Sequence, residues 1–491
     1  GSHMGAIGDQ VRRWWEDGSA AGNTGDFYDN RDGGHSQVNL QVFQQLTAIR
    51  YAGDPALEQR ARGIALPILH PGPTLGNASM AITSGPAPQS MPRLFLHNAA
   101  RAPLGYLFYR SSQFWVFPEH RDHDPDLGDC FALNTPFFVI TQGSSGTDQA
   151  VLKAAALTLA AFTPETKQHL VETGTLVPTL QRLLREAYVG SDRERYLSAE
   201  AHPTVFEPSR IDPVAMVNRA HDMTPQTIPP LALLTVKAET AAVPGVDAFD
   251  GHLPEALLTT PAVIARIDRS RQYSRQITLQ AGPTADGQGR PITWHWRVLR
   301  GDANRITFSP QADEHSRMTV TVPYHASTST TGRAEPIRSY RVDIAVFADN
   351  GVDLSAPAFY TIAYPPNETR TYVDGRLASI DYTAQRGPFS DPILFPHKPW
   401  SDRFVYDENG VLLGWVRRQR DGRDVAFNAF GRALPEGAEP GDDVPGTPVH
   451  YRIGPLRDGR RTVTFGPANG ATSATEGEGE GENGQGSDAA G

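Results

Sequence analysis

The stretch FFVITQGSSGTDQAVLKAAALTLAAF, residues 137–162, sets the fold class of the N-terminal half. Its first four residues form a short apolar run of the kind that is buried in a parallel sheet, and a glycine-rich turn follows. The Ala/Leu-rich remainder predicts a helix that ends near Phe162, because Thr163-Pro164-Glu165 is typical of a new helix start. A strand, a turn and a helix in this order predict an α/β domain, which we expect to span residues 5–240.

Strand patterns replace helical periodicity beyond residue 240, after a linker that we expect at 241–257. The run ITWHWRV at 292–298 alternates in polarity as a half-buried strand does. Another strand is predicted within 342–351, and it closes on an Asp-Asn-Gly turn. Short strands separated by turn residues predict a β-sandwich at 258–366.

Three motifs inside this region form a recognisable set. They are the turn Asp286-Gly287, the strand Thr293-Trp294-His295-Trp296 and the late strand with its Asp-Asn-Gly turn at 342–351. The set resembles the PKD family of extracellular sandwich modules, although Ala281-Gly282-Pro283-Thr284 stands where that family has an Asp-Ala-Ser run. The resemblance implies an all-β PKD-like sandwich, acting as a spacer or interaction module beside a catalytic or binding domain in a secreted protein.

The ends of the chain complete the domain plan. Residues 1–4 are the remnant of a cloning tag. Residues 367–468 keep a β-like pattern and contain a hairpin turn at Asn409-Gly410. Residues 469–491 are rich in Gly and Glu, and we predict a disordered tail because they have too little apolar surface to bury. The chain is therefore predicted to be multidomain: an N-terminal α/β sheet domain, a PKD-like sandwich and a further small β region.

This order of domains is similar to that of secreted proteins that pair a nucleoside-hydrolase-like α/β domain with a sandwich. That family has an N-terminal Asp-x-Gly-x-Asp-Asp pattern, and this sequence has YDNRDGGH at 28–35 in its place. The similarity therefore concerns the domain order and not the motif.

Charge and composition restrict the partners. The sequence has 55 acidic and 45 basic residues, for a net charge of −10. Nucleic-acid recognition needs a basic surface, so we predict no nucleic-acid partner and expect a neutral, sugar-like or cationic ligand.

No apolar run reaches the roughly 18 residues of a membrane span, so no integral membrane segment is predicted. Cys130 is a single cysteine and cannot form an internal disulfide. We expect a secreted, periplasmic or cell-surface protein whose signal peptide has been removed.

The densest polar run, EHRDHDPDLGD at 119–129, follows the apolar stretch 114–117. It should emerge at the carboxyl end of a strand, where open α/β sheets bind ligands. Carboxylates at alternate positions are typical of calcium loops, although the glycine lies one place later than in an EF-hand. The histidines could instead help to bind a transition metal such as zinc, and the third alternative is a solvated charged turn. The candidate metal ligands are Asp122, His123, Asp124 and Asp126, and the candidate catalytic residues are Glu119 and His120.

A second polar cluster, YDNRDGGHS at 28–36, combines carboxylates and a histidine with a flexible Gly-Gly pair. Asp29, Asp32 and His35 are candidate catalytic residues. The alternative is turn and cap chemistry, in which Ser36 caps a helix predicted at 38–49.

The glycine-serine turn at 143–147 precedes the helix described first, where free N–H groups and the helix dipole favour an anion or oxyanion. It is neither a Gly-x-Ser-x-Gly nucleophile elbow nor a P-loop, and a plain helix cap is the alternative. Ser144 is a candidate nucleophile. The candidate ligand-binding residues are Gly143, Ser145, Gly146 and Thr147, with Asn77 and Ser79 from another polar loop.

These clusters lead to two functional hypotheses. The first is an exported hydrolase that cleaves a polysaccharide, glycoside or ester by activating water with carboxylate and histidine residues, assisted by calcium or zinc or by no cofactor. The alternative is a non-catalytic extracellular protein that binds carbohydrate or calcium. Both require the clusters at 28–36, 119–126 and 143–147 to meet in space.

Overall fold

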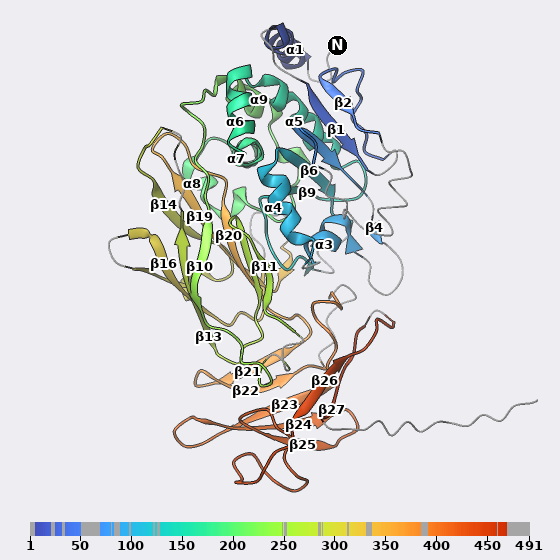
Figure 1. The fold of residues 1–491 in the computed structure, drawn as a ribbon, viewed down its shortest axis with the longest axis vertical. Coiled ribbons are helices and arrows are strands. Elements are labelled where there is room, and N and C mark those ends of the chain that lie inside the picture. The colour runs from blue at the N-terminus through green and yellow to red at the C-terminus, as the bar shows by residue number, and fades with distance from the viewer. Residues whose placement is uncertain are drawn as a thin grey trace, which may run out of the picture.

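The fold is described from a computed structural model of the chain. The residues that it describes are 5–20, 25–31, 35–50, 69–79, 81–82, 89–97, 100–120, 123–124, 128–247, 249, 253–282, 286, 288–311, 314–329, 336–383, 391–458 and 460–468. They form an N-terminal α/β region, a central unit of two β-sheets and a C-terminal β-rich unit (Figure 1). The predicted multidomain plan, with α/β structure before β structure, is confirmed at this level.

The α/β region is built on a sheet of five parallel strands in the order β2-β1-β3-β6-β9. The order changes direction at β1, because β2 lies on one side of it and all later strands lie on the other. Open α/β sheets bind ligands at such a switch point, beyond the carboxyl ends of the strands. The strands are β1 Asp26–Asn30, β2 Leu46–Ala48, β3 Thr74–Asn77, β6 Gln113–Pro118 and β9 Phe138–Thr141.

Helices cover both faces of this sheet. Gly76 and Asn77 are neighbours in β3 and so point to opposite faces. Gly76 lies against the ring of Trp115, which packs on Phe108 of α4, whereas Asn77 donates a hydrogen bond to Asp148 at the start of α5. Hence α4 and α5 lie on opposite faces. The helices are α1 Gly5–Ala20, α3 Met91–Leu96, α4 Ala102–Arg110, α5 Gln149–Ala161, α6 Pro164–Glu172, α7 Leu176–Val189, α8 Arg193–Tyr196 and α9 Pro213–Asp222.

The strand, turn and helix predicted at 137–162 are confirmed by β9 and α5, and Thr163 caps α6 by accepting the N–H of Thr166. The helix predicted at 38–49 is wrong, because turns and then β2 occupy these residues. The side chain of Asn39 accepts the N–H of Gln41, and such local bonds favour a turn over a helix.

The central unit consists of two sheets whose facing side chains share one hydrophobic core. One sheet is antiparallel, with the order β10-β13-β16-β15, and the other has the order β11-β12-β20-β19-β14, with β12 parallel to β20. The strands are β10 Leu234–Glu239, β11 Ala256–Thr259, β12 Val263–Ile267, β13 Ser274–Ala281, β14 Thr293–Arg300, β15 Thr307–Gln311, β16 Glu314–Pro323, β19 Arg341–Asp349 and β20 Ala358–Ala363. Because β10 pairs with β13, this unit begins before the boundary that we predicted at residue 240.

The five-stranded sheet of the central unit is covered on both faces. Along β19, Ile344 and Val346 belong to the core between the two sheets, whereas Ala345 and Phe347 belong to the core of the α/β region. Phe347 contacts the ring of Tyr196 in α8, with ring centroids 5.9 Å apart. The α/β region and the central unit are therefore joined by a continuous apolar core.

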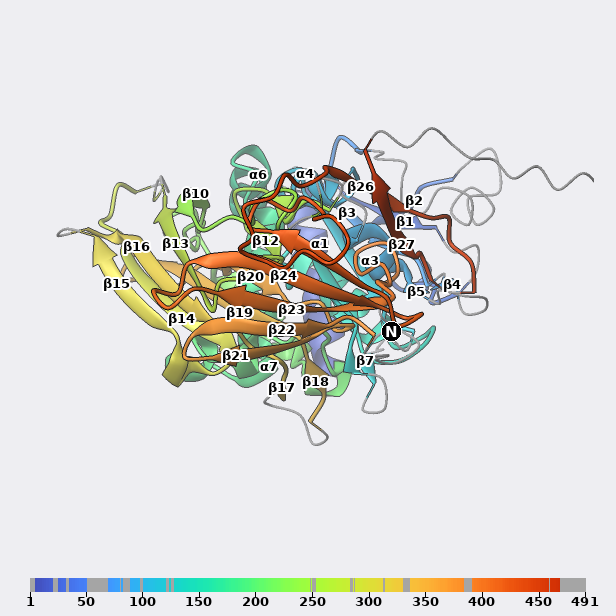
Figure 2. The ribbon, with the colours of Figure 1, turned by 90° about the horizontal axis from the view of Figure 1, so that it is seen from below.

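The C-terminal unit is an antiparallel sheet in the order β21-β22-β23-β24-β25, with a β26–β27 hairpin (Figure 2). The turn predicted at Asn409-Gly410 joins β23 to β24, and Gly410 has a φ of 81°. Phe249 and Leu253, from the predicted linker, are buried in this unit's core. The strands are β21 Thr369–Val373, β22 Arg376–Asp381, β23 Trp400–Tyr406, β24 Leu412–Gln419, β25 Asp424–Asn428, β26 Val449–Ile453 and β27 Val463–Pro467.

The described residues also contain three short strand pairs and the short 3-10 helices Ala199–Ala201, Pro208–Arg210 and Ala303–Arg305. The strand pairs are β4 Ala81–Ile82 with β5 Gln89–Ser90, β7 His123–Asp124 with β8 Gly128–Asp129, and β17 Thr328–Ser329 with β18 Arg338–Ser339. The predicted tail at 469–491 lies outside the described residues.

Candidate functional site

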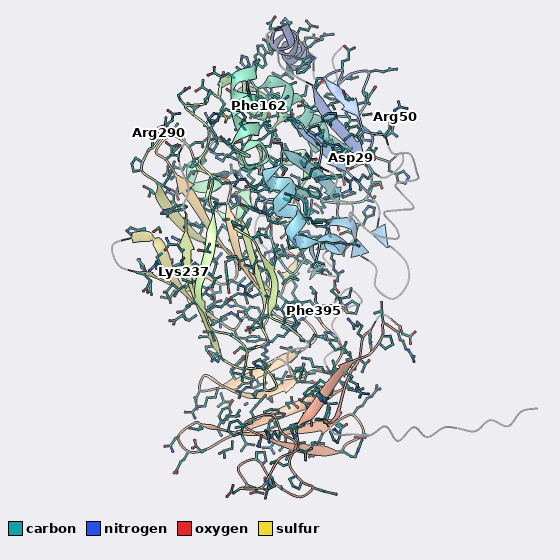
Figure 3. All side chains as sticks on the ribbon, in the orientation of Figure 1. Asp29, Arg50, Phe162, Lys237, Arg290 and Phe395 are labelled. Atoms are coloured by element: carbon teal, nitrogen blue, oxygen red, sulfur yellow. The ribbon has the colours of Figure 1, made fainter. Side chains whose placement is uncertain are left out.

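The candidate site lies at the carboxyl ends of β1, β3, β6 and β9, and we call it the carboxyl-edge site. It comprises the described residues of 29–36, 77–79, 119–124 and 141–148. Because neighbouring strands are parallel, with Asn30 opposite Asn77 and Pro118 opposite Thr141, these segments leave the sheet at one edge. Figure 3 places Asp29 on the side of the α/β region that faces away from Lys237 and Arg290 of the central unit.

Asn77 connects three of these segments from a fully buried position. Its amide nitrogen donates to the carbonyl oxygen of Ser36 at 3.2 Å and to Oδ2 of Asp148 at 3.0 Å. Its Oδ1 accepts the hydroxyl of Tyr28 at 3.1 Å. Since buried polar groups must be hydrogen-bonded, Asn77 fixes the loop after β1 against the start of α5. Ser79, the other candidate from this loop, is buried as well.

Ser36 makes the second connection. Its Oγ accepts the N–H of Gly146 at 2.7 Å, which joins the loop after β1 directly to the glycine-serine turn after β9. Ser36 has a φ of 53°, in the left-handed region that residues other than glycine rarely adopt. Such strain persists only where the surrounding contacts impose it, and it is concentrated at functional sites.

Glu119 makes the third connection. It is buried, its Oε1 accepts the N–H of Gly143 at 3.0 Å, and its Oε2 accepts the N–H of His123 at 3.1 Å. Both carboxylate oxygens of Glu119 therefore accept backbone N–H groups. We conclude that Glu119 positions the loop after β6. The next residue, His120, is half-buried and has a φ of 49°. The segments that the sequence predicted to meet are thus in contact through side-chain hydrogen bonds.

Asp29 belongs to a separate group on the opposite face of β1. Its neighbour Tyr28 points toward Asn77, so Asp29 points to the other face. Asp29 is fully buried, and its Oδ2 lies 2.9 Å from Nε of Arg31 and 3.6 Å from Nε2 of His70. The guanidinium of Arg31 lies 4.7 Å from the ring centroid of Trp115. This ion pair anchors the end of β1.

The groups best placed to meet a ligand are the exposed ones. His35, Ser144, Ser145 and Gly146 are exposed, and Thr147 is half-buried. The hydroxyl of Thr147 donates to the carbonyl oxygen of Ser144 at 2.9 Å, which shapes the turn before α5. Ser144, Ser145 and Thr147 offer three hydroxyl groups at the positive end of the α5 dipole, and His35 offers an exposed imidazole.

The predicted metal ligands are only partly described. His123 is buried and Asp124 is half-buried, and as neighbours in β7 they point to opposite sides. Asp122 and Asp126 lie outside the described residues, as does the catalytic candidate Asp32. Within the described ranges, no group of three or more His, Cys, Asp or Glu side chains is arranged to hold a metal ion.

Sequence reasoning missed Arg31, His70 and Asp148. Arg31 lies within the polar cluster at 28–36, and Asp148 directly follows the turn at 143–147. Their closeness to these motifs in the sequence could have identified them as site residues. His70 lies in a Pro/Gly-rich segment far from both motifs in the chain and carries no local signal.

Comparison of the sequence with protein-family models and with curated proteins gives no match that bears on the function of the site. No helix in the described part of the chain is long and apolar enough to span a membrane. No protein-family model matches the sequence, and no curated protein matches it significantly.

Proposed function

We propose that this protein is an exported hydrolase that cleaves a polysaccharide, glycoside or ester at the carboxyl-edge site. One observation carries the proposal: the loops after β1, β3, β6 and β9 are bonded together through Ser36, Asn77 and Glu119 at the switch point of the parallel sheet. Connecting loops alone do not require buried polar side chains and left-handed backbone at this density. Ligands bind at this edge in open α/β sheets.

The chemistry follows from which groups remain accessible. His35 is exposed and His120 is half-buried, and an imidazole nitrogen can take a proton from water, as a general base must. Asp29 and Glu119 are buried in ion pairing or backbone hydrogen bonds and act by positioning. The turn at Ser144 lies at the positive end of α5, which favours the negative charge that develops on a carbonyl or leaving-group oxygen. A net charge of −10 favours a neutral substrate over a polyanion.

We also propose that the central unit is a PKD-like sandwich. The shared core of its two sheets and the placement of Trp296 in that core support this assignment. Its extensive apolar contact with the α/β region suits a structural partner of the catalytic domain better than a freely hinged spacer.

His35→Ala and His120→Ala are each expected to lower kcat/KM about a hundredfold, because each removes a proton acceptor from the site. Hydrolysis is measured on chromogenic glycosides and esters, and melting temperature is followed in parallel. His450→Ala, at an exposed position of the C-terminal unit, is the matched control. Ser144→Ala is compared with exposed Ser191→Ala in the same way.

Activity of both histidine variants equal to that of His450→Ala would exclude this site. Binding of an oligosaccharide without hydrolysis of any substrate would instead favour the second proposal, a non-catalytic carbohydrate- or calcium-binding protein. Loss of binding in His35→Ala would then still place the ligand at the carboxyl-edge site.

For the metal, calcium is the stronger proposal over zinc, because Asp122, Asp124 and Asp126 alternate along the chain whereas His123 and Asp124 diverge. We expect EDTA to lower the melting temperature of the wild type and excess calcium to restore it. The double variant Asp122→Ala, Asp124→Ala should contain no calcium and respond to neither reagent. A chelator response that persists in the double variant would place the metal elsewhere, and no response in the wild type would remove the metal from the proposal.

A further inference from the structure

A guanidinium is buried in the α/β region without a carboxylate beside it. Arg185 of α7 has no exposed surface. Its Nη1 lies 3.3 Å from Nδ1 of His202, and its Nη2 donates to the carbonyl oxygen of Thr135 at 3.4 Å. Among the described residues, Nε of Arg185 makes no hydrogen bond and no acidic side chain pairs with the guanidinium.

The neighbouring titratable groups do not supply the missing negative charge. Burial first, and then Arg185, lower the pKa of His202 well below its usual value, so the ring is neutral and Nδ1 accepts from the guanidinium. Burial raises the pKa of Tyr109 and of Tyr196, so both hydroxyl groups keep their protons. Burial lowers the pKa of Arg185 to about 10, which leaves it charged at neutral pH.

The adjacent arginine shows what is missing. Arg182 is also buried on α7, but its Nη1 lies 2.8 Å from Glu186 and its Nη2 lies 2.8 Å from Asp353. Asp353 and Glu186 also pair with Arg219, at 2.9 Å and 4.0 Å, so the carboxylates of this region are committed to Arg182 and Arg219. A buried charge without an anionic partner costs several kcal/mol, and the ring of Phe206, whose centroid lies 5.2 Å from the guanidinium, offsets only part of that cost.

A second unsatisfied side chain lies one helical turn away. Gln181 has no exposed surface, and neither its amide nitrogen nor its amide oxygen makes a hydrogen bond with any described residue. Residues four apart share a helix face, so the amide of Gln181 and the guanidinium of Arg185 border the same interior region. Each buried amide atom without a partner costs about 1–3 kcal/mol.

We infer that a small monovalent anion of the chloride class binds between Arg185 and Gln181 in the interior of the α/β region. The anion accepts the N–H of Arg185 Nε and an N–H of the Gln181 amide, and it supplies the counter-charge that the chain does not provide. This site is separate from the carboxyl-edge site, and it stabilises the fold whether or not the proposed hydrolase activity is correct.

The test is the effect of chloride on melting temperature at constant ionic strength, with gluconate as the replacement anion because it is too bulky for a closed interior site. An anion that binds only the folded state stabilises it with rising concentration. The wild type should gain about 2 °C for each tenfold increase in chloride above the dissociation constant. Arg185→Gln should lose this dependence, whereas Arg182→Gln, which breaks the neighbouring ion pairs, should be less stable and keep it. Equal melting in chloride and gluconate, or a dependence retained in Arg185→Gln, would overturn the inference.

A second variant and a direct observation cover the case in which Arg185→Gln fails to fold. Gln181→Leu keeps an uncharged side chain of similar size and should shift the chloride response to higher concentrations. Crystals of the wild type grown in bromide should show an anomalous peak within hydrogen-bond distance of Arg185 Nε. The absence of that peak would show that water, and not an anion, satisfies these groups.

Discussion

Arg341→Ala is expected to lower the free energy of unfolding by about 3–5 kcal/mol, the usual cost of removing one partner of a buried ion pair. Arg341 is 1% exposed in β19 and lies between the central unit and the α/β region. Its Nε is 2.9 Å from Asp343, its Nη1 is 3.3 Å from Asp129, and Nη1 also donates to the carbonyl oxygen of Phe131 at 2.7 Å. The substitution leaves two buried carboxylates with too little positive charge.

The pH dependence of stability gives this prediction a second signature. Burial opposes ionisation of Asp129, but Arg341 and Arg300 outweigh it and lower the pKa from 3.8 to about 2. The unfolded chain therefore binds a proton at higher pH than the folded chain does. The stabilisation from Asp129 is complete above about pH 4 and is lost as the pH falls toward 2. In Arg341→Ala the folded-state pKa of Asp129 rises toward its unfolded value, so the loss of stability as the pH falls from 4 toward 2 should be smaller than in the wild type.

Chemical denaturation at pH 7 and at intervals down to pH 3 measures both effects. Arg317→Ala is the matched control, since Arg317 is exposed on β16 of the same unit and surface substitutions usually change stability by less than about 0.5 kcal/mol. If Arg341→Ala costs no more than Arg317→Ala, the buried cluster contributes nothing to the junction.

Asp402→Ala is expected to destabilise the C-terminal unit by a similar 3–5 kcal/mol or so. Arg417 is 1% exposed and forms a two-point ion pair with Asp402, with both N–O distances 2.8 Å. Its Nη1 donates to the hydroxyl of Tyr451 at 3.0 Å, and its guanidinium lies 4.3 Å from the ring centroid of Trp400. Without Asp402 a full positive charge remains among aromatic rings.

Two further variants sharpen this experiment. The double variant Asp402→Leu, Arg417→Met removes both charges and should be more stable than Asp402→Ala, because replacing a whole buried pair with apolar groups is often close to neutral. Asp424→Ala breaks the neighbouring pair with Arg418, which is exposed to solvent and should contribute far less to stability than the buried pair. Hydrogen exchange of the β23 and β24 amides reports on this unit alone. Equal losses in Asp402→Ala and Asp424→Ala would contradict the prediction.

Local sequence signals predicted the elements that local chemistry determines. The buried run before the glycine-serine turn, the helix after it and the cap at Thr163 all depend on residues within a few positions of one another. The helix at 38–49 failed because pairing with β1, together with the Asn39 turn, outweighs the helical spacing of its apolar residues. The membership of β10 in the central sheets, ahead of the expected boundary at 240, depends on its partner β13 and has no local signal in the sequence.

In the candidate site, too, some features follow from the sequence and others depend on contacts between distant residues. The rule that parallel strands end at one edge was enough to predict that the polar loops adjoin. The same rule could not predict that both carboxylate oxygens of Glu119 would accept backbone N–H groups. Nor could it predict that Asp29 would lie on the face of the sheet that carries Trp115. Those outcomes depend on strand register and on partners such as His70, which nothing in the neighbouring sequence identifies.

The alternation of Ile344 and Val346 with Ala345 and Phe347 along β19 limits how this chain can be divided. A fragment cut near residue 233 would present to water the apolar helices that normally rest on that sheet, and the remainder would present the matching strands. Both halves would tend to aggregate rather than fold as soluble pieces. Exchange of either half between genes would face the same obstacle, so the two halves are expected to be inherited together.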